Sequence, residues 1–377
     1  MSAPCGICTK EVECKDKAIQ CESDCMRWFH AKCVKLTDQE YEQLAKSETI
    51  WECPACRSPD LPDLNTIDAV DIFHFDFQQN LPTPELSVGK QFYLTLLWTY
   101  LFGVYSASTK MTTTFMWHEL LARRGCNNVI SCLSRFIFHT TLGRTGAKWS
   151  IWWADNCPGQ NKNNYIMWFF QDLIRRNVYS RIDYIFLIAG HTYGSTDQAF
   201  GVIERYTARI DTVYTPMQWY EHVRNAGLGV KSVQVVEMEQ GYFYDFRQHL
   251  RKMYTERNKD EDKQNLDFHN IVWFNFGKGE RETNGKLVLI DHPIEVWVCY
   301  TYDVKEQPRR VCYYKKRNWE ELAPAPLLYS QYPIPIKAAK AEDVLKLVNE
   351  YLPHDYRHFY AEIPVIEGES DESSDEN

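Results

Sequence analysis

Cysteines crowd the first 56 residues of this 377-residue chain, which hold eight of its 13 cysteines. The chain starts Met-Ser-Ala-Pro-Cys without an apolar signal segment, so we expect no secretion and a reducing location, where clustered cysteines bind metal rather than pair as disulfides. Seven of the cysteines and one histidine form four ligand pairs, each separated by two or three residues. The pairs are Cys5 and Cys8, Cys21 and Cys25, His30 and Cys33, and Cys53 and Cys56.

Eight ligands of this kind make two tetrahedral sites, each closed by four side chains and therefore structural rather than catalytic. A segment of about 60 residues buries too little core to fold alone, so bound metal would supply the missing stability. We therefore predict two structural Zn²⁺ ions within residues 1–60. Cys14 stands outside the four pairs, and we expect it to be a free thiol.

The ligand order, four cysteines, then one histidine, then three cysteines, resembles that of the PHD finger. A RING finger would place its histidine fourth, whereas here the histidine is fifth. Trp51, two residues before Cys53, and the run Trp28-Phe29-His30 also match the PHD pattern. The resemblance covers residues 4–57 and implies a cross-braced pair of zinc sites. One zinc would be held by Cys5, Cys8, His30 and Cys33, and the other by Cys21, Cys25, Cys53 and Cys56.

PHD fingers commonly bind the N-terminal tails of histones, so the resemblance implies a chromatin-associated protein of the nucleus. In methyl-lysine readers, one wall of an aromatic cage is a tryptophan two residues before the histidine, the position of Trp28. A cage needs at least two aromatic faces, and residues 9–20 contain no aromatic side chain. Two alternatives stay open, namely binding of an unmodified or lightly modified tail and a Trp28 that only covers the zinc knuckle. The tail would add as an extra strand beside Lys17, Ala18, Ile19 and Gln20.

The net charge of −9 comes from the two ends of the chain. Residues 1–60 contain more acidic than basic side chains, and residues 367–377 contain acids and no bases. Residues 61–366 carry equal numbers of both signs. Because a dedicated nucleic-acid binder usually has a basic excess, any contact with DNA must come from a local patch. Phosphate contacts could come from Lys162, Arg175, Arg176 and Arg181, which could equally be an ordinary solvated face.

A Pro- and Asp-rich linker over 61–69 precedes a segment, 70–230, in which strand and helix patterns alternate. Ser195-Thr-Asp-Gln198 fits a capping box at the start of the last helix. The order β-β-β-α-β-α-β-α is that of the ribonuclease-H-like fold. We expect strands at 69–77, 91–105, 111–117, 149–154 and 182–189, and helices at 120–140, 161–176 and 196–209.

The ribonuclease-H-like fold places acids on its first strand, at the end of its fourth strand and on the helix after its fifth. Asp76, Asp155 and Asp197 occupy these places, and Glu204, two turns beyond Asp197 on the same helix face, is the rival third acid. Three converging carboxylates can hold two Mg²⁺ ions about 3.5–4 Å apart, and Mg²⁺ requires such hard oxygen ligands. Structural roles stay open, since Asp155 could cap a turn and Asp197 could be a first-turn residue that the helix dipole favours.

Three segments resemble an uncharacterised domain of transposon-encoded and transposon-derived animal proteins, which we relate to the DDE/D transposases. They start at Phe75-Asp-Phe-Gln, Asp155-Asn-Cys-Pro and Gly190-His-Thr-Tyr. The resemblance spans about residues 70–310 and implies a transposase-derived domain. Because a PHD finger directly precedes it, we favour a domesticated or truncated copy over an active Mg²⁺-dependent DNA nuclease or strand transferase.

The C-terminal third is expected to comprise a β-rich extension over 231–320, a helical segment over 321–366 and a disordered acidic tail over 367–377. A charged stretch over 247–266 is predicted to be helical with an exposed loop at 259–263, and 337–351 has an amphipathic helix pattern that ends before Pro353. No run of about 18 apolar residues occurs, so we expect no membrane span.

Overall fold

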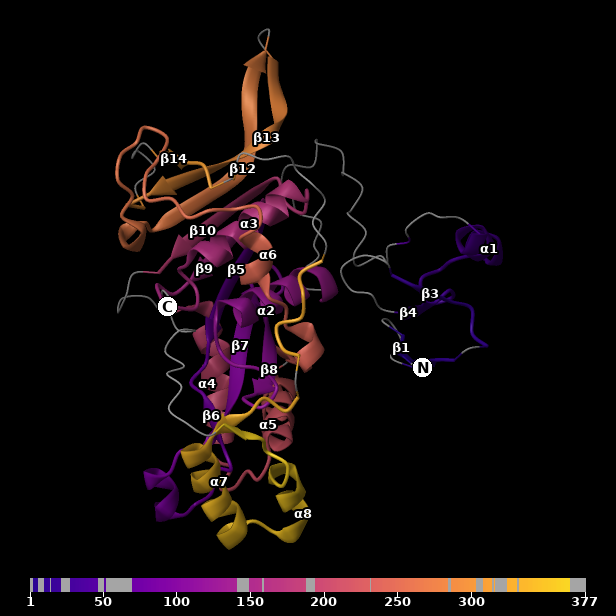
Figure 1. Cartoon of the computed structure of the whole chain (residues 1–377), viewed down its shortest axis with the longest axis vertical. Coiled ribbons are helices and arrows are strands. Elements are labelled where there is room, and N and C mark those ends of the chain that lie inside the picture. The colour runs from indigo at the N-terminus through magenta and orange to yellow at the C-terminus, as the bar shows by residue number, and fades with distance from the viewer. Residues whose placement is uncertain are drawn as a thin grey trace. The chain divides into compact units, whose positions relative to one another are not determined.

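The structure is a computed structural model that divides the chain into two compact units (Figure 1). The N-terminal unit comprises Met1–Thr66 and Trp319–Pro324, and the body comprises Ile67–Asn318 and Ala325–Asn377. Each unit is described by itself. The structure describes all residues except 1–2, 6–9, 14, 22–27, 47–50, 52–69, 141–148, 158, 188–193, 231, 284–285, 303–307, 314, 316–323, 331 and 367–377.

The N-terminal unit is built from short strands around a very small core. Strands β1 (Ala3–Pro4) and β2 (Glu11–Val12) pair antiparallel, as do β3 (Ala18–Gln20) and β4 (Trp28–His30), and helix α1 covers Asp38–Lys46. Its hydrophobic cluster contains the buried side chains of Cys21, Phe29 and Trp51. Phe29 and Trp51 meet edge to face at 5.8 Å. Such a core is too small to stabilise a fold by itself, which agrees with a metal-dependent unit.

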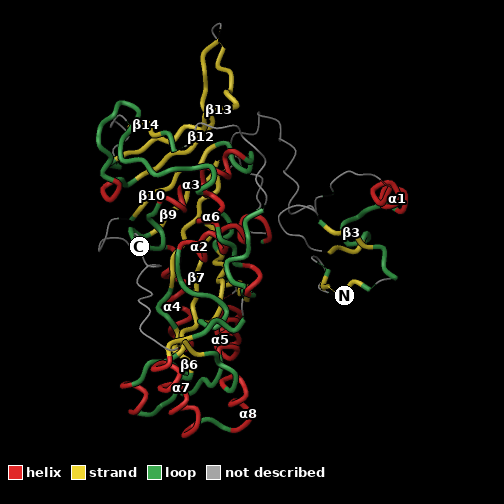
Figure 2. Tube along the Cα trace, in the orientation of Figure 1, coloured by secondary structure: helices red, strands yellow, loops and turns green. Residues whose placement is uncertain are grey.

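One ten-stranded sheet runs through the body, with the order β11-β8-β7-β5-β9-β10-β12-β13-β14 and β6 beside β7 (Figure 2). In its centre β5 is antiparallel to β7 and parallel to β9, and β9 is parallel to β10. The strands are β5 (Val70–Phe77), β6 (Leu81–Thr83), β7 (Leu97–Ser106), β8 (Met111–His118), β9 (Trp149–Ala154), β10 (Arg181–Phe186), β11 (Val233–Glu237), β12 (Trp273–Thr283), β13 (Lys286–Cys299) and β14 (Arg309–Val311).

Helices cover both faces of this sheet, and the alternation of side chains along β5 shows why. Phe73 contacts Phe136 of helix α2 (Cys126–His139), and helix α3 (Asn164–Arg175) lies on the same face. The opposite face of β5 presents His74 and Asp76, which face helix α4 (Ser195–Thr207). Helix α5 (Pro216–Val230) packs beside α4 in one apolar cluster. The face that carries polar residues is therefore the α4 face.

The predicted element order, three strands followed by alternating helices and strands up to α4, is found in the body, with the short β6 as an additional strand that was not predicted. Two of the predicted boundaries were wrong by six residues, and others by up to three. Residues 89–93 form a 3-10 helix, η1 (Gly89–Tyr93), and not the start of a strand, and α2 begins at Cys126 rather than at residue 120. The residues before α2 form turns in which Glu119 and Arg123 bond to other parts of the chain.

The predicted helix over 247–266 was also wrong, because only α6 (Phe246–Leu250) is helical there. Beyond it the charged side chains bond both locally and to β14, where Arg309 pairs with Asp260 and Arg310 with Glu261. Asp260 accepts a hydrogen bond from the Gln264 N–H at 2.7 Å, and Lys263 has a φ of 64°, which a continuing helix cannot accommodate. Shorter 3-10 segments are η2 (Gln240–Tyr242), η3 (Phe268–Asn270) and η4 (His358–Tyr360).

The C-terminal segment folds back on the sheet through helix α7 (Ala338–Tyr351), which agrees with the predicted helix within one residue. Helix α8 (His354–Arg357) follows, and β15 (Ile336–Lys337) pairs in parallel with β16 (Val365–Ile366). The apolar side chains of the C-terminal segment pack against Leu97 at the start of β7. None of the described helices is both long and apolar enough to cross a bilayer.

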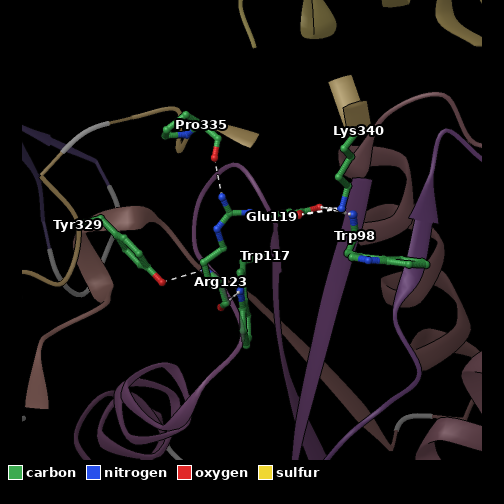
Figure 3. A network of polar contacts seen from close by, with 7 residues as sticks. All are labelled: Trp98, Trp117, Glu119, Arg123, Tyr329, Pro335 and Lys340. Carbon is green, nitrogen blue, oxygen red and sulfur yellow. Dashed lines mark hydrogen bonds and ion pairs between the residues drawn. The ribbon is translucent and has the colours of Figure 1, made fainter. Parts of the chain in front are cut away.

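An ion network fastens this segment to the turn after β8 (Figure 3). Glu119 accepts from Lys340 Nζ at 2.6 Å and from Arg123 at 3.1 Å, and it also accepts the Trp98 backbone N–H. Arg123 donates onward to the Pro335 carbonyl at 2.5 Å. Because Glu119 and Lys340 are both largely buried, each charge needs compensation, which Glu119 supplies to Lys340 and which Lys340 and Arg123 together supply to Glu119.

Candidate functional site

The N-terminal unit brings together Cys5, His30 and Cys33, whose ligand atoms all lie within 4.8 Å of one another. His30 Nδ1 lies 3.9 Å from Cys33 Sγ, and its Nε2 lies 3.5 Å from an Asp16 carboxylate oxygen. Two sulfurs and one imidazole nitrogen fit a structural zinc site, and a carboxylate on the second ring nitrogen orients such a histidine. These are three of the four ligands predicted for the first zinc. The fourth, Cys8, lies outside the described residues.

Of the second predicted zinc site, the structure describes only Cys21, which is buried beside Phe29 and Trp51. The remaining three ligands, Cys25, Cys53 and Cys56, lie outside the described residues, as does Cys14. The second ion therefore stays a prediction.

The predicted tail-binding strand is β3, with Lys17 just before it. Ile19 of β3 pairs in register with Phe29 of β4, and the Ala18 carbonyl accepts the Tyr41 hydroxyl at 3.3 Å. Lys17 forms an ion pair with Asp38 at 2.8 Å. Gln20 lies in register with Trp28, whose side chain is 38% exposed. An exposed tryptophan beside a short strand is available to a peptide ligand.

Two of the predicted acids lie side by side at the ends of neighbouring parallel strands. Phe75 of β5 is in register with Ala154 of β9, so the next residues, Asp76 and Asp155, follow in step on the same face. Asp155 accepts hydrogen bonds from the Cys157 N–H at 3.3 Å and from the Asn161 side chain. Strand pairing thus joins two acids that are 79 residues apart.

The third acid, Asp197, lies in the first turn of α4, and its carboxylate accepts the Gly194 N–H at 2.6 Å. The residue at the helix N-cap is therefore Gly194 and not Ser195, which corrects the predicted capping box. The Thr196 N–H, which also lies in the first turn of α4, donates to His74 Nδ1 on β5 at 3.1 Å. This contact fixes the start of α4 against the strand that carries Asp76.

The electrostatics show that Asp155 and Asp197 both act on the Asp76 carboxyl group. Burial raises the pKa of Asp76 to about 7, helped by repulsion from Asp155 and Asp197, while the Phe77 N–H and Arg124 act in the opposite direction. Burial also lowers the pKa of His74 to about 4, against the pull of Asp197 and Asp155. The three aspartates therefore share one polar region of the α4 face.

Two limits on this region follow from the geometry. In the described part of the chain, Cys5, His30 and Cys33 are the only group of three such ligands whose donor atoms all lie within 4.8 Å, so the aspartates are spaced more widely than a one-ion site. Glu204, the rival third acid, is exposed two turns along α4 and is not among the charges that act on Asp76.

Arg124 is a residue of this region that the sequence did not single out. Its guanidinium lies 4.2 Å from the centre of the Phe77 ring and donates to Asn80 and Gln160, each at 3.0 Å. Its charge acts on both Asp76 and Asp155. Arg124 also lines an open groove of about 820 Å³. No pattern around Arg124 in the sequence signals this position, because the residue lies in a turn.

The four basic residues considered for phosphate contacts are engaged within the fold instead. Lys162 is buried and donates to the His269 carbonyl, Arg175 bonds to Asp172, Arg176 lies over Phe138, and Arg181 bonds to Asp183. The interpretation of these residues as a phosphate-binding face is therefore not supported by their contacts.

Comparison with known proteins places the N-terminal unit in a class. Residues 2–60 match the family described as "Pygopus, PHD-type zinc finger", so this unit is a PHD-type zinc finger with structural zinc. It is 44% identical over 54 residues to Pygopus homolog 1 of Mus musculus and of Homo sapiens, and 39% identical to Pygopus homolog 2 of Homo sapiens. The match spans 14% of this chain and 13% of each relative.

The body has a separate match. Residues 90–272 match a family described as "Domain of unknown function (DUF7869)". The matched range includes Asp155 and Asp197 and starts after Asp76. The body is a mixed α/β domain with a large sheet. Its kinship with transposases stays a prediction.

Proposed function

We propose that this protein is a chromatin-associated factor of the nucleus whose PHD finger holds two zinc ions and binds a histone N-terminal tail. The match of residues 2–60 to a Pygopus-type PHD finger is the observation that supports this best. The tail would lie beside β3, along Lys17–Gln20, and reach the exposed face of Trp28. Residues 9–20 supply no second aromatic wall, so the proposed ligand is an unmodified or lightly methylated tail.

Calorimetric titration of the full chain with histone tail peptides of graded lysine methylation tests this function. Wild type should bind an unmodified or monomethylated tail, and Trp28→Ala should lose most of that affinity. Phe92→Ala is the matched control, because Phe92 is an equally large aromatic side chain that is 88% exposed on the body. If no tail binds wild type, or if both variants weaken binding alike, the tail-binding proposal fails.

We also propose, as a second function, that the body is a ribonuclease-H-like domain whose acids hold divalent cations for phosphodiester chemistry on DNA. The supporting observation is the strand arrangement. Numbered along the chain without the short β6, the first five strands of the body lie in the order 3-2-1-4-5, with only the second antiparallel to the rest. Asp76, Asp155 and Asp197 then fall at the places where this fold has its acids.

The ligand atoms of the three acids do not all lie within 4.8 Å of one another, so the proposed site would hold a pair of ions about 3.5–4 Å apart that the carboxylates bridge. Bound Mg²⁺ would polarise a phosphodiester and activate an attacking hydroxyl. In hydrolysis, water oxygen bonds to phosphorus while the P–O bond to the 3′ oxygen breaks, and that oxygen takes up a proton. Asn161 holds the Asp155 carboxylate, and Arg124 offers positive charge beside Asp76 and Asp155.

Titration with Mn²⁺, followed by electron paramagnetic resonance, tests the acidic site in the full chain. Wild type should bind Mn²⁺, and Asp76→Asn, Asp155→Asn and Asp197→Asn should each weaken binding. Glu204→Gln is the matched control on α4 and should bind like wild type. Absence of Mn²⁺ binding to wild type would remove the enzymatic proposal and leave the PHD-finger function untouched.

A further inference from the structure

His74 is a buried histidine, 5% exposed, two residues before Asp76 on the same face of β5. Its Nδ1 accepts the Thr196 backbone N–H at 3.1 Å and lies 3.0 Å from the Thr196 hydroxyl. A backbone N–H can only donate, so Nδ1 carries no proton and the neutral ring has its proton on Nε2. The Thr196 N–H is one of the first-turn donors that a helix cannot satisfy internally. His74 therefore caps α4 from a neighbouring strand.

Gly194 shows how closely the start of α4 approaches this ring. A Cβ at position 194 would lie 2.0 Å from His74 Cε1 and 2.8 Å from each ring nitrogen, so a side chain there cannot be accommodated without movement. The same Gly194 donates its N–H to the Asp197 carboxylate at 2.6 Å. Gly194 and Thr196, which both touch His74, thus flank the turn that sets the position of Asp197.

A role in packing alone explains this histidine poorly. Its Nε2 is buried and has no hydrogen-bond partner among the residues that the structure describes. A buried donor without a partner destabilises a fold, whereas leucine would fill the same space without that cost. What leucine cannot supply is the acceptor for the Thr196 N–H. Histidine differs from leucine here because its Nδ1 accepts a hydrogen bond from the first turn of α4.

We propose that His74 is a positioning residue, which holds the first turn of α4 against β5 and thereby places Asp197 beside Asp76 and Asp155. This inference rests on the proposed cation-binding function of the three aspartates. It assigns His74 no contact with the ions or the substrate. His74, together with its neighbour Gly194, is then a further residue on which the geometry of the acidic site depends.

Backbone amide exchange of the metal-free full chain tests the contact itself. His74→Leu should speed exchange at the Thr196 and Gly194 amides about tenfold, through loss of one hydrogen bond. His74→Asn keeps an acceptor near Nδ1 and should restore most of the protection. His118→Leu is the control, because His118 is 2% exposed on β8 and packs against Phe359 in the C-terminal segment. Unchanged exchange in His74→Leu overturns the inference.

Mn²⁺ titration of the same variants tests the consequence for the site. His74→Leu should weaken binding about tenfold or more, as loss of a supporting contact does at metal sites, and His74→Asn should recover most of it. In an Asp197→Asn background, His74→Leu should cause no further loss, because it acts through Asp197. Equal losses in both backgrounds would instead mean general damage. If wild type binds no Mn²⁺, the cation-binding function fails, and the Gly194 amide alone then decides whether His74 positions Asp197.

Discussion

Asp76 and Asp155 stand next to each other because Phe75 and Ala154, the residues before them, are paired in register on parallel strands. Two carboxylates on one buried sheet face repel each other, and burial adds to the cost of ionising them. The pKa of Asp76 is accordingly raised to about 7. An arrangement that costs stability without bound cations is typical of a functional site.

The first prediction follows from the sign of this shift. Between about pH 4 and pH 7 the unfolded chain has lost the Asp76 proton while the folded chain keeps it, so rising pH favours unfolding. Across that window Asp76 lowers the free energy of unfolding by at most about 4 kcal/mol, the equivalent of three pKa units. Asp76→Asn removes the ionisation. When a chelator removes divalent cations, the Asp76→Asn variant should therefore be more stable than wild type at pH 8 and about as stable as wild type at pH 4.

Urea denaturation at the two pH values measures this difference. Glu204→Gln, on the exposed face of α4, is the control and should change stability little at either pH. A variant Asp76→Asn that is destabilised at pH 8 would show that the ionised carboxylate has a favourable partner, and the interpretation of Asp76 as a strained acid would be wrong.

The second prediction concerns zinc in the N-terminal unit. Cys33→Ser removes one ligand from the site formed with Cys5 and His30, so the chain should lose about one of two zinc ions. Because Phe29 and Trp51 are the main core contact of this unit, their packing should loosen as metal leaves. Elemental analysis gives the zinc content, and tryptophan fluorescence follows the packing.

Cys312→Ser is the control for this prediction, since Cys312 is a half-buried cysteine of the body. It should keep two zinc ions per chain. A wild-type chain with a single zinc ion would contradict the cross-braced arrangement and leave only the site whose ligands are described.

How much of this could be foreseen from the sequence depends on how far apart the interacting residues lie. Cys5, His30 and Cys33 were predictable as one group of zinc ligands because spacing along the chain defines them. Asp155 was predictable as an acid at the end of a strand, where α/β sheets place polar sites, and Asp76 as an acid within the first strand. His74 and Arg124 were not, because their roles arise from how α4 and the turn before α2 pack on the sheet. The helix predicted over 247–266 failed because Asp260 accepts the Gln264 N–H in a local turn and pairs with Arg309 of β14, so helical hydrogen bonds do not continue there.

The third prediction tests the network that fastens the C-terminal segment to the sheet. Lys340→Met leaves the buried Glu119 carboxylate with Arg123 as its remaining cationic partner (Figure 3). Removing one member of a buried ion pair costs up to about 3 kcal/mol, and here Arg123 offsets part of that loss because it still pairs with Glu119. The double variant Glu119→Gln with Lys340→Met should recover part of that loss, since no buried carboxylate then remains with only one of its two cationic partners.

Lys346→Met is the matched control on the same helix, because Lys346 is an exposed lysine that pairs with Asp343 three residues away. An exposed pair of this kind contributes at most about 1 kcal/mol. Chemical denaturation of the four chains gives the free energies, and limited proteolysis shows whether α7 detaches first. Equal effects of Lys340→Met and Lys346→Met would mean that apolar packing alone holds α7. A deficit confined to Lys340→Met would assign that role to the ion network at Glu119.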